Sequence, residues 1–192
     1  MSKIRVYLSP SLQEHNVGVL NYGNEMERMH QIAAYASQFL KLFGFSVKIA
    51  PRSLAKLNEP QDYYAAIKAS NDWKADVHVC LHSNTVPGTI GFYHNGDDDD
   101  RKLAQCLARR IAPISPGKDA LAVRPDTSIY ASGFAELRLT LAPACLIELF
   151  SHTNPAEVKH AISHRATYGL AIAWGVCDYF GVSPKMPKVK VS

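Results

Sequence analysis

The chain has 192 residues, of which 47% are hydrophobic and 20% charged, with 21 Lys and Arg against 17 Asp and Glu. That much apolar surface excludes an intrinsically disordered chain, and the sequence contains no run of about 18 apolar residues that could span a membrane. A net charge of +4, scattered along the sequence, does not indicate a nucleic-acid-binding protein. At this length we expect one compact domain.

Apolar runs of strand length alternate with segments of helical period along the chain. The expected strands lie at residues 4–8, 45–49, 77–81, 90–93 and 144–149, and the expected helices at 25–43, 62–70, 101–111 and 155–180. Strands separated by helices of this length are typical of βαβ units, so we expect a three-layer α/β fold, a mostly parallel sheet flanked by helices. Ligands of such sheets bind beyond the carboxyl ends of the strands.

The two ends of the chain set the expected limits of the domain. The N-terminus enters the first strand pattern without the apolar core of a signal peptide, so we expect synthesis in the cytoplasm. Residues 1–182 are expected to form the folded domain, and residues 183–192, with their lysines and prolines, a basic tail or linker.

Cysteines and a run of aspartates receive structural interpretations. No CxxC pair is present, so we expect no structural zinc cluster and a packing role for all four thiols, Cys80, Cys106, Cys145 and Cys177. The acidic run at 97–100 directly precedes an expected helix and is interpreted as a solvated helix cap.

Glu25 stands at the start of the first expected helix, on its apolar face. The apolar residues of this helix recur at spacings of three and four, and Glu25 falls in line with Met29 and Ile32. Asn24 and Glu27 match a capping box, so Glu27 has a structural explanation and Glu25 has none. A buried carboxylate needs a partner, and a metal ion would supply one.

Two strand ends add polar side chains at one edge of the expected sheet. His82 ends the run 77–82, and Glu148 interrupts the otherwise apolar run 144–149. His78 shares the side-chain parity of His82 but lies four residues deeper. A buried salt bridge is the structural alternative for Glu148, although its own strand contains no basic residue.

A polar loop, residues 9–16, follows the first strand and carries His15, which can fold back over this edge. His15, Glu25 and His82 would then form a His/Glu/His set with an open fourth position, which is the ligand set of a catalytic zinc. Glu148 would be the nearby carboxylate that a zinc hydrolase uses as general base.

At these residues the sequence resembles the zinc-dependent N-acetylmuramoyl-L-alanine amidases of the family-3 type, over residues 4 to about 180. The Leu-His-Ser-Asn segment at 81–84 is similar to the family's Ile-His-Ala-Asn segment. The segment 143–148, with Asn154 six residues after the glutamate, is similar to the family's catalytic segment. The family places its first histidine in an Asp-Pro-Gly-His-Gly run, whereas this chain has Ser-Pro-Ser-Leu at 9–12, and His15 is the nearest histidine.

The resemblance implies hydrolysis of the amide that joins the lactyl group of N-acetylmuramic acid to L-alanine in peptidoglycan. It implies Zn²⁺ on His15, Glu25 and His82, proton transfer by Glu148, and residues 1–182 as the catalytic domain. Peptidoglycan would be the partner, met at the bacterial cell wall, with no nucleic acid and no membrane insertion. A separate wall-binding domain beyond the tail would be compatible with this function.

Two other function classes stay open. A zinc peptidase acting on the stem peptide would use the same four residues, and a wall-binding module would have lost catalysis. Among the remaining histidines, His160 and His164 stand four apart on the last expected helix without the glutamate of an HExxH motif, so a solvated face is expected there. His152 lies in a loop near the expected site and is an alternative substrate contact or metal ligand.

Overall fold

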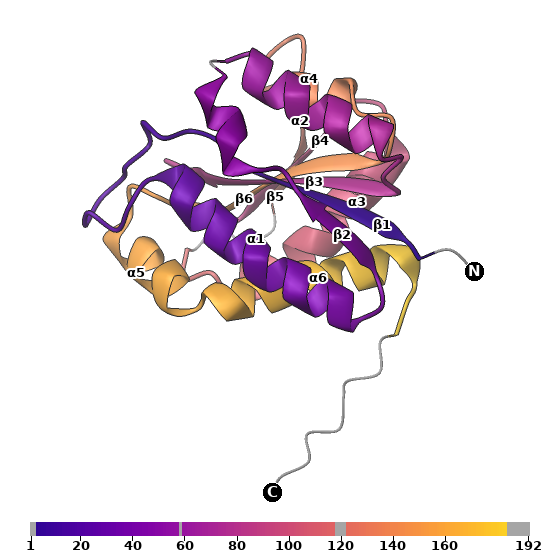
Figure 1. The fold of residues 1–192 in the computed structure, drawn as a ribbon. Helices are drawn as coiled ribbons and strands as arrows, with labels where there is room; N and C mark the ends of the chain where they lie inside the picture. Colours follow the sequence, from indigo (N-terminus) through magenta and orange to yellow (C-terminus); the bar gives the residue numbers. More distant parts are fainter. Residues whose placement is uncertain (1–2, 58, 118–121, 184–192) are drawn as a thin grey trace, which may run out of the picture.

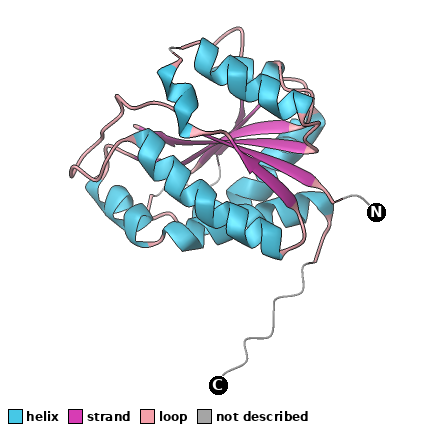
Figure 2. Ribbon diagram, viewed as in Figure 1, coloured by secondary structure: helices cyan, strands magenta, loops and turns pink. Residues whose placement is uncertain are grey.

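The computed structural model describes residues 3–57, 59–117 and 122–183, in which a central sheet has helices on both faces (Figures 1 and 2). Its strands are β1 (Arg5–Pro10), β2 (Ser46–Ile49), β3 (Val77–Asn84), β4 (Ile90–Tyr93), β5 (Ala122–Pro125) and β6 (Ala144–Ser151). They lie in the order β2-β1-β3-β6-β4-β5, and all neighbours are parallel except β4 and β6. The expected α/β fold with a mostly parallel sheet is confirmed.

Helices divide between the two faces of this sheet. The α-helices are α1 (Glu25–Leu42), α2 (Gln61–Asp72), α3 (Asp98–Ile111), α4 (Ala135–Arg138), α5 (Pro155–Ser163) and α6 (Arg165–Phe180), and the 3₁₀ turns are η1 (Arg52–Lys56), η2 (Ala112–Ile114) and η3 (Asp126–Ser128). α1, α3 and α6 pack with the sheet around the largest hydrophobic core, whereas α2 and α4 lie over the opposite face (Figure 1).

Alternation along β3 decides which residues reach the functional face. Val77, Val79 and Leu81 point into the large core beneath α1, α3 and α6. Because successive side chains of a strand point to opposite faces, the intervening residues point toward α2 and α4. The polar residues His78 and His82 therefore share the less covered face, together with Cys80.

Three local expectations need correction. Residues 155–180 form two helices, because His164 leaves the helical conformation between α5 and α6 with φ −119° and ψ 27°. β5 and α4 were not predicted, since their sequences, Ala-Val-Arg-Pro and Ala-Glu-Leu-Arg, contain neither an apolar run nor a repeat that shows a period. The other expected strands and helices are present, with ends displaced by up to three residues.

The expected basic tail at 183–192 lies outside the described residues, apart from its first residue. No helix in the described part of the chain combines the length and apolar character that crossing a membrane requires.

Candidate active site

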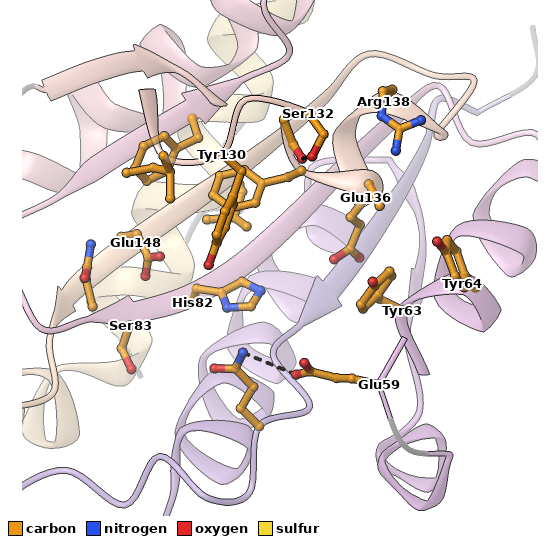
Figure 3. Close-up of a pocket in the computed structure, with 18 residues that line it drawn as sticks. Glu59, Tyr63, Tyr64, His82, Ser83, Tyr130, Ser132, Glu136, Arg138 and Glu148 are labelled. Carbon is orange, nitrogen blue, oxygen red and sulfur yellow. Dashed lines mark hydrogen bonds between the residues drawn. The ribbon is translucent and has the colours of Figure 1, made fainter. Parts of the chain in front are cut away.

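A pocket of about 680 Å³ opens beside the carboxyl ends of β3 and β6. Its floor holds His82 and Glu148, and aromatic side chains from α2 and from the segment before α4 form its walls (Figure 3). The lining includes Tyr63, Tyr64, Tyr130 and Phe134. This position agrees with the expectation that ligands bind at the carboxyl ends of parallel strands.

Glu25 lies beneath this pocket and pairs with His82. Its side chain is 1% exposed, and Oε1 lies 3.1 Å from His82 Nδ1. Burial alone would raise the pKa of Glu25, but the hydrogen bond and charge of His82, with help from Asn16 and Ser11, lower it to about 2. Burial likewise opposes the charge on His82, yet Glu25 and the neighbouring carboxylates raise the pKa of His82 to about 9. Each group of the pair therefore favours the charged form of the other.

The start of α1 explains why Glu25 points inward and Glu27 does not. Asn24 caps the helix by accepting a hydrogen bond from the Glu27 backbone N–H at 2.9 Å, and the Glu27 carboxylate accepts one from the Asn24 N–H at 3.1 Å. The expected capping box is thus confirmed. Glu25 is one of the fully buried residues, as the helical phase predicted.

Glu148 lies next to His82 in the sheet, since the two residues are register partners of β6 and β3. Its Oε2 atom is buried and has no hydrogen-bond partner among the described residues. The pKa of Glu148 is raised to about 7, mainly by burial. The charge of Glu25 also raises this pKa, and the charge of His82 opposes the rise only in part. A carboxylate with a free oxygen and a pKa near neutrality is suited to accepting and returning a proton.

His15 does not join the other expected ligands. Neither His15 nor His152 forms with Glu25 and His82 a set whose ligand atoms all lie within 4.8 Å of one another. His15 is exposed. The buried Arg28 explains this, because its guanidinium donates to the carbonyl oxygens of Asn16, at 3.0 Å, and of Val17, at 2.9 Å. The loop is thereby fixed with the Asn16 side chain on Glu25, at 2.9 Å, while its neighbour His15 faces solvent.

His152 is the histidine that the structure brings to Glu25 from the opposite side. It is buried, with Nδ1 2.9 Å from the Ser83 carbonyl oxygen and 3.8 Å from Glu25 Oε2. The Glu25 carboxylate therefore lies between two histidines, His82 and His152. The two histidines of the last expected helix, His160 and His164, instead stack on each other outside this site at a centroid distance of 4.0 Å.

Glu136 is a pocket residue that the sequence analysis missed. It lies on the single-turn helix α4, and its Oε1 accepts a hydrogen bond from Ser9 Oγ at 2.5 Å and lies 3.1 Å from His78 Nε2. Burial would raise the pKa of Glu136, but the hydrogen bond and charge of His78 and the hydrogen bond from Ser9 outweigh it and lower the pKa. The inward parity of His78 was the available signal, because a buried histidine requires a polar partner.

The residues at the pocket floor fit a metal ion in part. Glu25 and His82 are a carboxylate and an imidazole, both zinc ligands, and their nearest atoms are 3.1 Å apart. Glu148 Oε2 is an unpartnered buried polar atom beside them, which fits a site that holds a further polar group or water.

Solved structures with a similar fold include N-acetylmuramoyl-L-alanine amidases and the catalytic domain of an endolysin. The catalytic domain of CwlV, an N-acetylmuramoyl-L-alanine amidase from Bacillus (Paenibacillus) polymyxa var. colistinus, superposes with a TM-score of 0.78 at 20% identity, over 94% of this chain and 99% of that one. The amidase AmiC2 of Nostoc punctiforme superposes with a TM-score of 0.76 at 19% sequence identity, over 94% of this chain and 98% of that one. The catalytic domain of the CD27L endolysin, which targets Clostridia difficile, superposes with a TM-score of 0.72 at 16% sequence identity, over 91% of this chain and 97% of that one.

At these identities the structural matches establish the fold, and a search of curated proteins gives no match. The family is established by sequence, because the profile described as N-acetylmuramoyl-L-alanine amidase matches residues 6–178. That span runs from β1 through nearly all of α6 and contains every residue of the site described above. The chain therefore belongs to the N-acetylmuramoyl-L-alanine amidase family of enzymes, which act on peptidoglycan.

Proposed function

We propose that this amidase is zinc-dependent and cleaves the amide between the lactyl group of N-acetylmuramic acid and L-alanine. The observation that carries the proposal is the unpartnered Glu148 Oε2, buried beside the Glu25–His82 pair on the floor of an open pocket. A glutamate in this position has the free oxygen that a general base needs.

Glu25 and His82 would hold the zinc ion. His15 is the third ligand that the comparison with the family sequence pattern suggests, and His152 is the alternative. His152 is the nearer of the two, because it is buried 3.8 Å from Glu25 whereas His15 is exposed. It would have to bind through Nε2, since its Nδ1 lies 2.9 Å from the Ser83 carbonyl oxygen, which only accepts a hydrogen bond. Bound zinc would polarise the scissile carbonyl group and make water more acidic.

Glu148 would perform both proton transfers. It takes a proton from the attacking water and later gives it to the departing alanine nitrogen, which cannot leave as an amide anion because that anion is too basic. The pKa of about 7 suits both directions of transfer at neutral pH. Its position on a central strand holds the carboxylate in a fixed direction.

The pocket walls suit a substrate that is part sugar and part peptide. A volume of about 680 Å³ lies within the usual range of roughly 300–1,000 Å³ for ligand pockets. Tyr63, Tyr64 and Tyr130 present apolar ring faces together with hydroxyl groups, which can contact sugar rings and hydrogen-bond to amides.

Analysis of the ends released from purified peptidoglycan tests the proposed bond. New N-terminal alanine, with activity lost on chelation and restored by zinc, is the expected result. Any other new amine would indicate a zinc peptidase, and retention on the wall without new ends would indicate a binding module. Either result would contradict the proposal.

The enzyme acts on the bacterial cell wall, where its substrate is located. A separate wall-binding domain is proposed as an addition to the domain described here. Sedimentation of a Glu148→Gln variant with purified walls measures how much affinity the catalytic domain has alone. Tight binding by this domain would make a separate module unnecessary.

A further inference from the structure

A second polar cluster lies deeper on the same face of β3 than His82. Within the described residues, His78, Cys80 and Glu136 are the one group of three potential metal ligands whose ligand atoms all lie within 4.8 Å of one another. His78 and Cys80 are fully buried, and the Glu136 side chain is 12% exposed. Ser9, opposite Cys80 in the β1–β3 register, completes the cluster.

Each side chain of this cluster is held by the fold. His78 and Cys80 are two residues apart on a central strand, so they point the same way. The Tyr7 ring stacks on His78 at a centroid distance of 5.2 Å and an interplanar angle of 20°, which fixes the imidazole plane. A metal-binding histidine is usually oriented by a hydrogen bond from its second ring nitrogen. His78 Nδ1 has no such partner within the described part of the chain, so the stacked Tyr7 ring orients the imidazole instead.

Charge balance favours a divalent cation in this cluster. Among the described residues, the one basic group within ion-pair distance of Glu136 is the imidazole of His78, which carries a charge only when it is protonated. Figure 3 shows Arg138, on the same helical turn, pointing away from the Glu136 carboxylate. A divalent ion bound by a carboxylate, a thiolate and a neutral imidazole carries no net charge, which removes the cost of burying an incompletely paired anion.

We propose that His78, Cys80 and Glu136 form a second metal site that binds Zn²⁺ or a similar thiolate-seeking cation. The nitrogen, sulfur and oxygen set is one that zinc accepts and that magnesium and calcium do not. Binding forms a metal–sulfur bond and releases the thiol proton of Cys80 to solvent. Ser9 Oγ borders the fourth position, and Glu136 connects the site to the pocket.

A metal ion in this site would link α4 to the sheet, because Glu136 lies on α4 whereas His78 and Cys80 lie on β3. α4 has only four residues, and no side chain caps its N-terminus, so it has little stability of its own. Its neighbours Tyr130 and Phe134 form a wall of the pocket. Metal in the His78–Cys80–Glu136 site would therefore stabilise this wall, and it would do so independently of the zinc proposed at Glu25 and His82.

Cobalt substitution distinguishes the two sites, because only the deeper one contains sulfur. The full chain is stripped with a chelator and titrated with Co²⁺, and the thiolate-to-cobalt charge-transfer absorption in the near ultraviolet is recorded. We expect this absorption in the wild type and in His82→Ala, and its loss in Cys80→Ala. Cys145→Ala is the matched control, because Cys145 is buried on the opposite face of the sheet.

Absence of the absorption in the wild type, or its persistence in Cys80→Ala, would overturn the inference. If Cys80→Ala does not fold, X-ray absorption on the zinc-loaded wild type decides, since a zinc–sulfur distance of about 2.3 Å is required. A spectrum with nitrogen and oxygen neighbours only would also overturn it. None of these outcomes affects the proposed amidase mechanism, which the released-end analysis tests separately.

Discussion

The two polar clusters on one face of β3 contain similar groups but differ in how their carboxylates are satisfied. At the strand end, Glu148 keeps a buried oxygen without a partner, and its pKa is raised to about 7, mainly by burial. Deeper in the sheet, Glu136 has hydrogen-bond partners in Ser9 and His78, and its pKa is lowered despite burial.

This difference shows that burial alone does not determine the role of a carboxylate. A group without donors tends to bind a proton and can pass it on, whereas a group with several donors stays ionised and serves as an anchor or ligand. The number of donors around each carboxylate separates the proposed base, Glu148, from Glu136.

The largest effect is expected for Glu25, the proposed carboxylate ligand of zinc in the strand-end cluster. Glu25→Ala should abolish zinc binding and hydrolysis, because His82 loses its carboxylate partner. Glu27→Ala is the matched control and should lose only a capping interaction, about 1 kcal/mol of stability. Metal analysis and thermal melting of both variants check this, and a zinc-free Glu27→Ala protein would contradict it.

Glu148→Gln should reduce the rate of hydrolysis by about a hundred- to ten-thousand-fold. Glutamine keeps the size of the side chain but cannot take up the proton from water. Zinc content and melting temperature should stay near wild type, because Oε2 makes no hydrogen bond within the described residues that the substitution could break. Near-normal cleavage by the zinc-loaded variant would remove Glu148 from the mechanism.

The third zinc ligand is tested by comparing two histidine variants. His152→Ala should weaken zinc affinity about ten- to a hundredfold. His152 lies beside Glu25, so its loss should be felt if it binds zinc directly and also if it only orients that carboxylate. His15→Ala should change affinity little, because His15 is exposed. Competition with a zinc chelator measures both constants. The reverse order would show that the loop 9–16 rearranges to bring His15 to the metal.

The smallest effect is expected at Asp100, a buried carboxylate that lies outside the pocket. Burial raises its pKa to about 6, assisted by Asp97 and opposed by backbone hydrogen bonds from Ala144 and His94. Because the folded pKa exceeds the unfolded value, the stability from protonated Asp100 is complete below about pH 4 and is lost as the pH rises through 6.

The asparagine of Asp100→Asn stays neutral at every pH. The free energy of unfolding of this variant should therefore exceed that of the wild type by about 1 kcal/mol at pH 8 and should equal it at pH 4. Urea unfolding at the two pH values measures this difference. Hydrolysis per folded molecule should be unchanged, since a raised pKa outside the pocket has no catalytic use. An equal stability change at both pH values would mean that Asp100 does not titrate in this range.

The sequence determined the features that depend on local period. Alternation and helical spacing predicted the α/β class, five of the six strands and the inward direction of Glu25, because these patterns repeat over several residues. The approach of His82 and Glu148 followed from the rule that parallel strands present their carboxyl ends at one edge. Their proximity could therefore be predicted without coordinates.

Only the tertiary structure decided the features that depend on non-periodic segments. Glu136 reaches His78 from a single helical turn, and this contact joins residues 58 positions apart. The loop that carries His15 is directed by hydrogen bonds to the buried Arg28, which turn Asn16 toward Glu25 and leave His15 in solvent. Short loops and single turns show no sequence periodicity that could predict them. Their positions are fixed by long-range contacts, which only the tertiary structure shows.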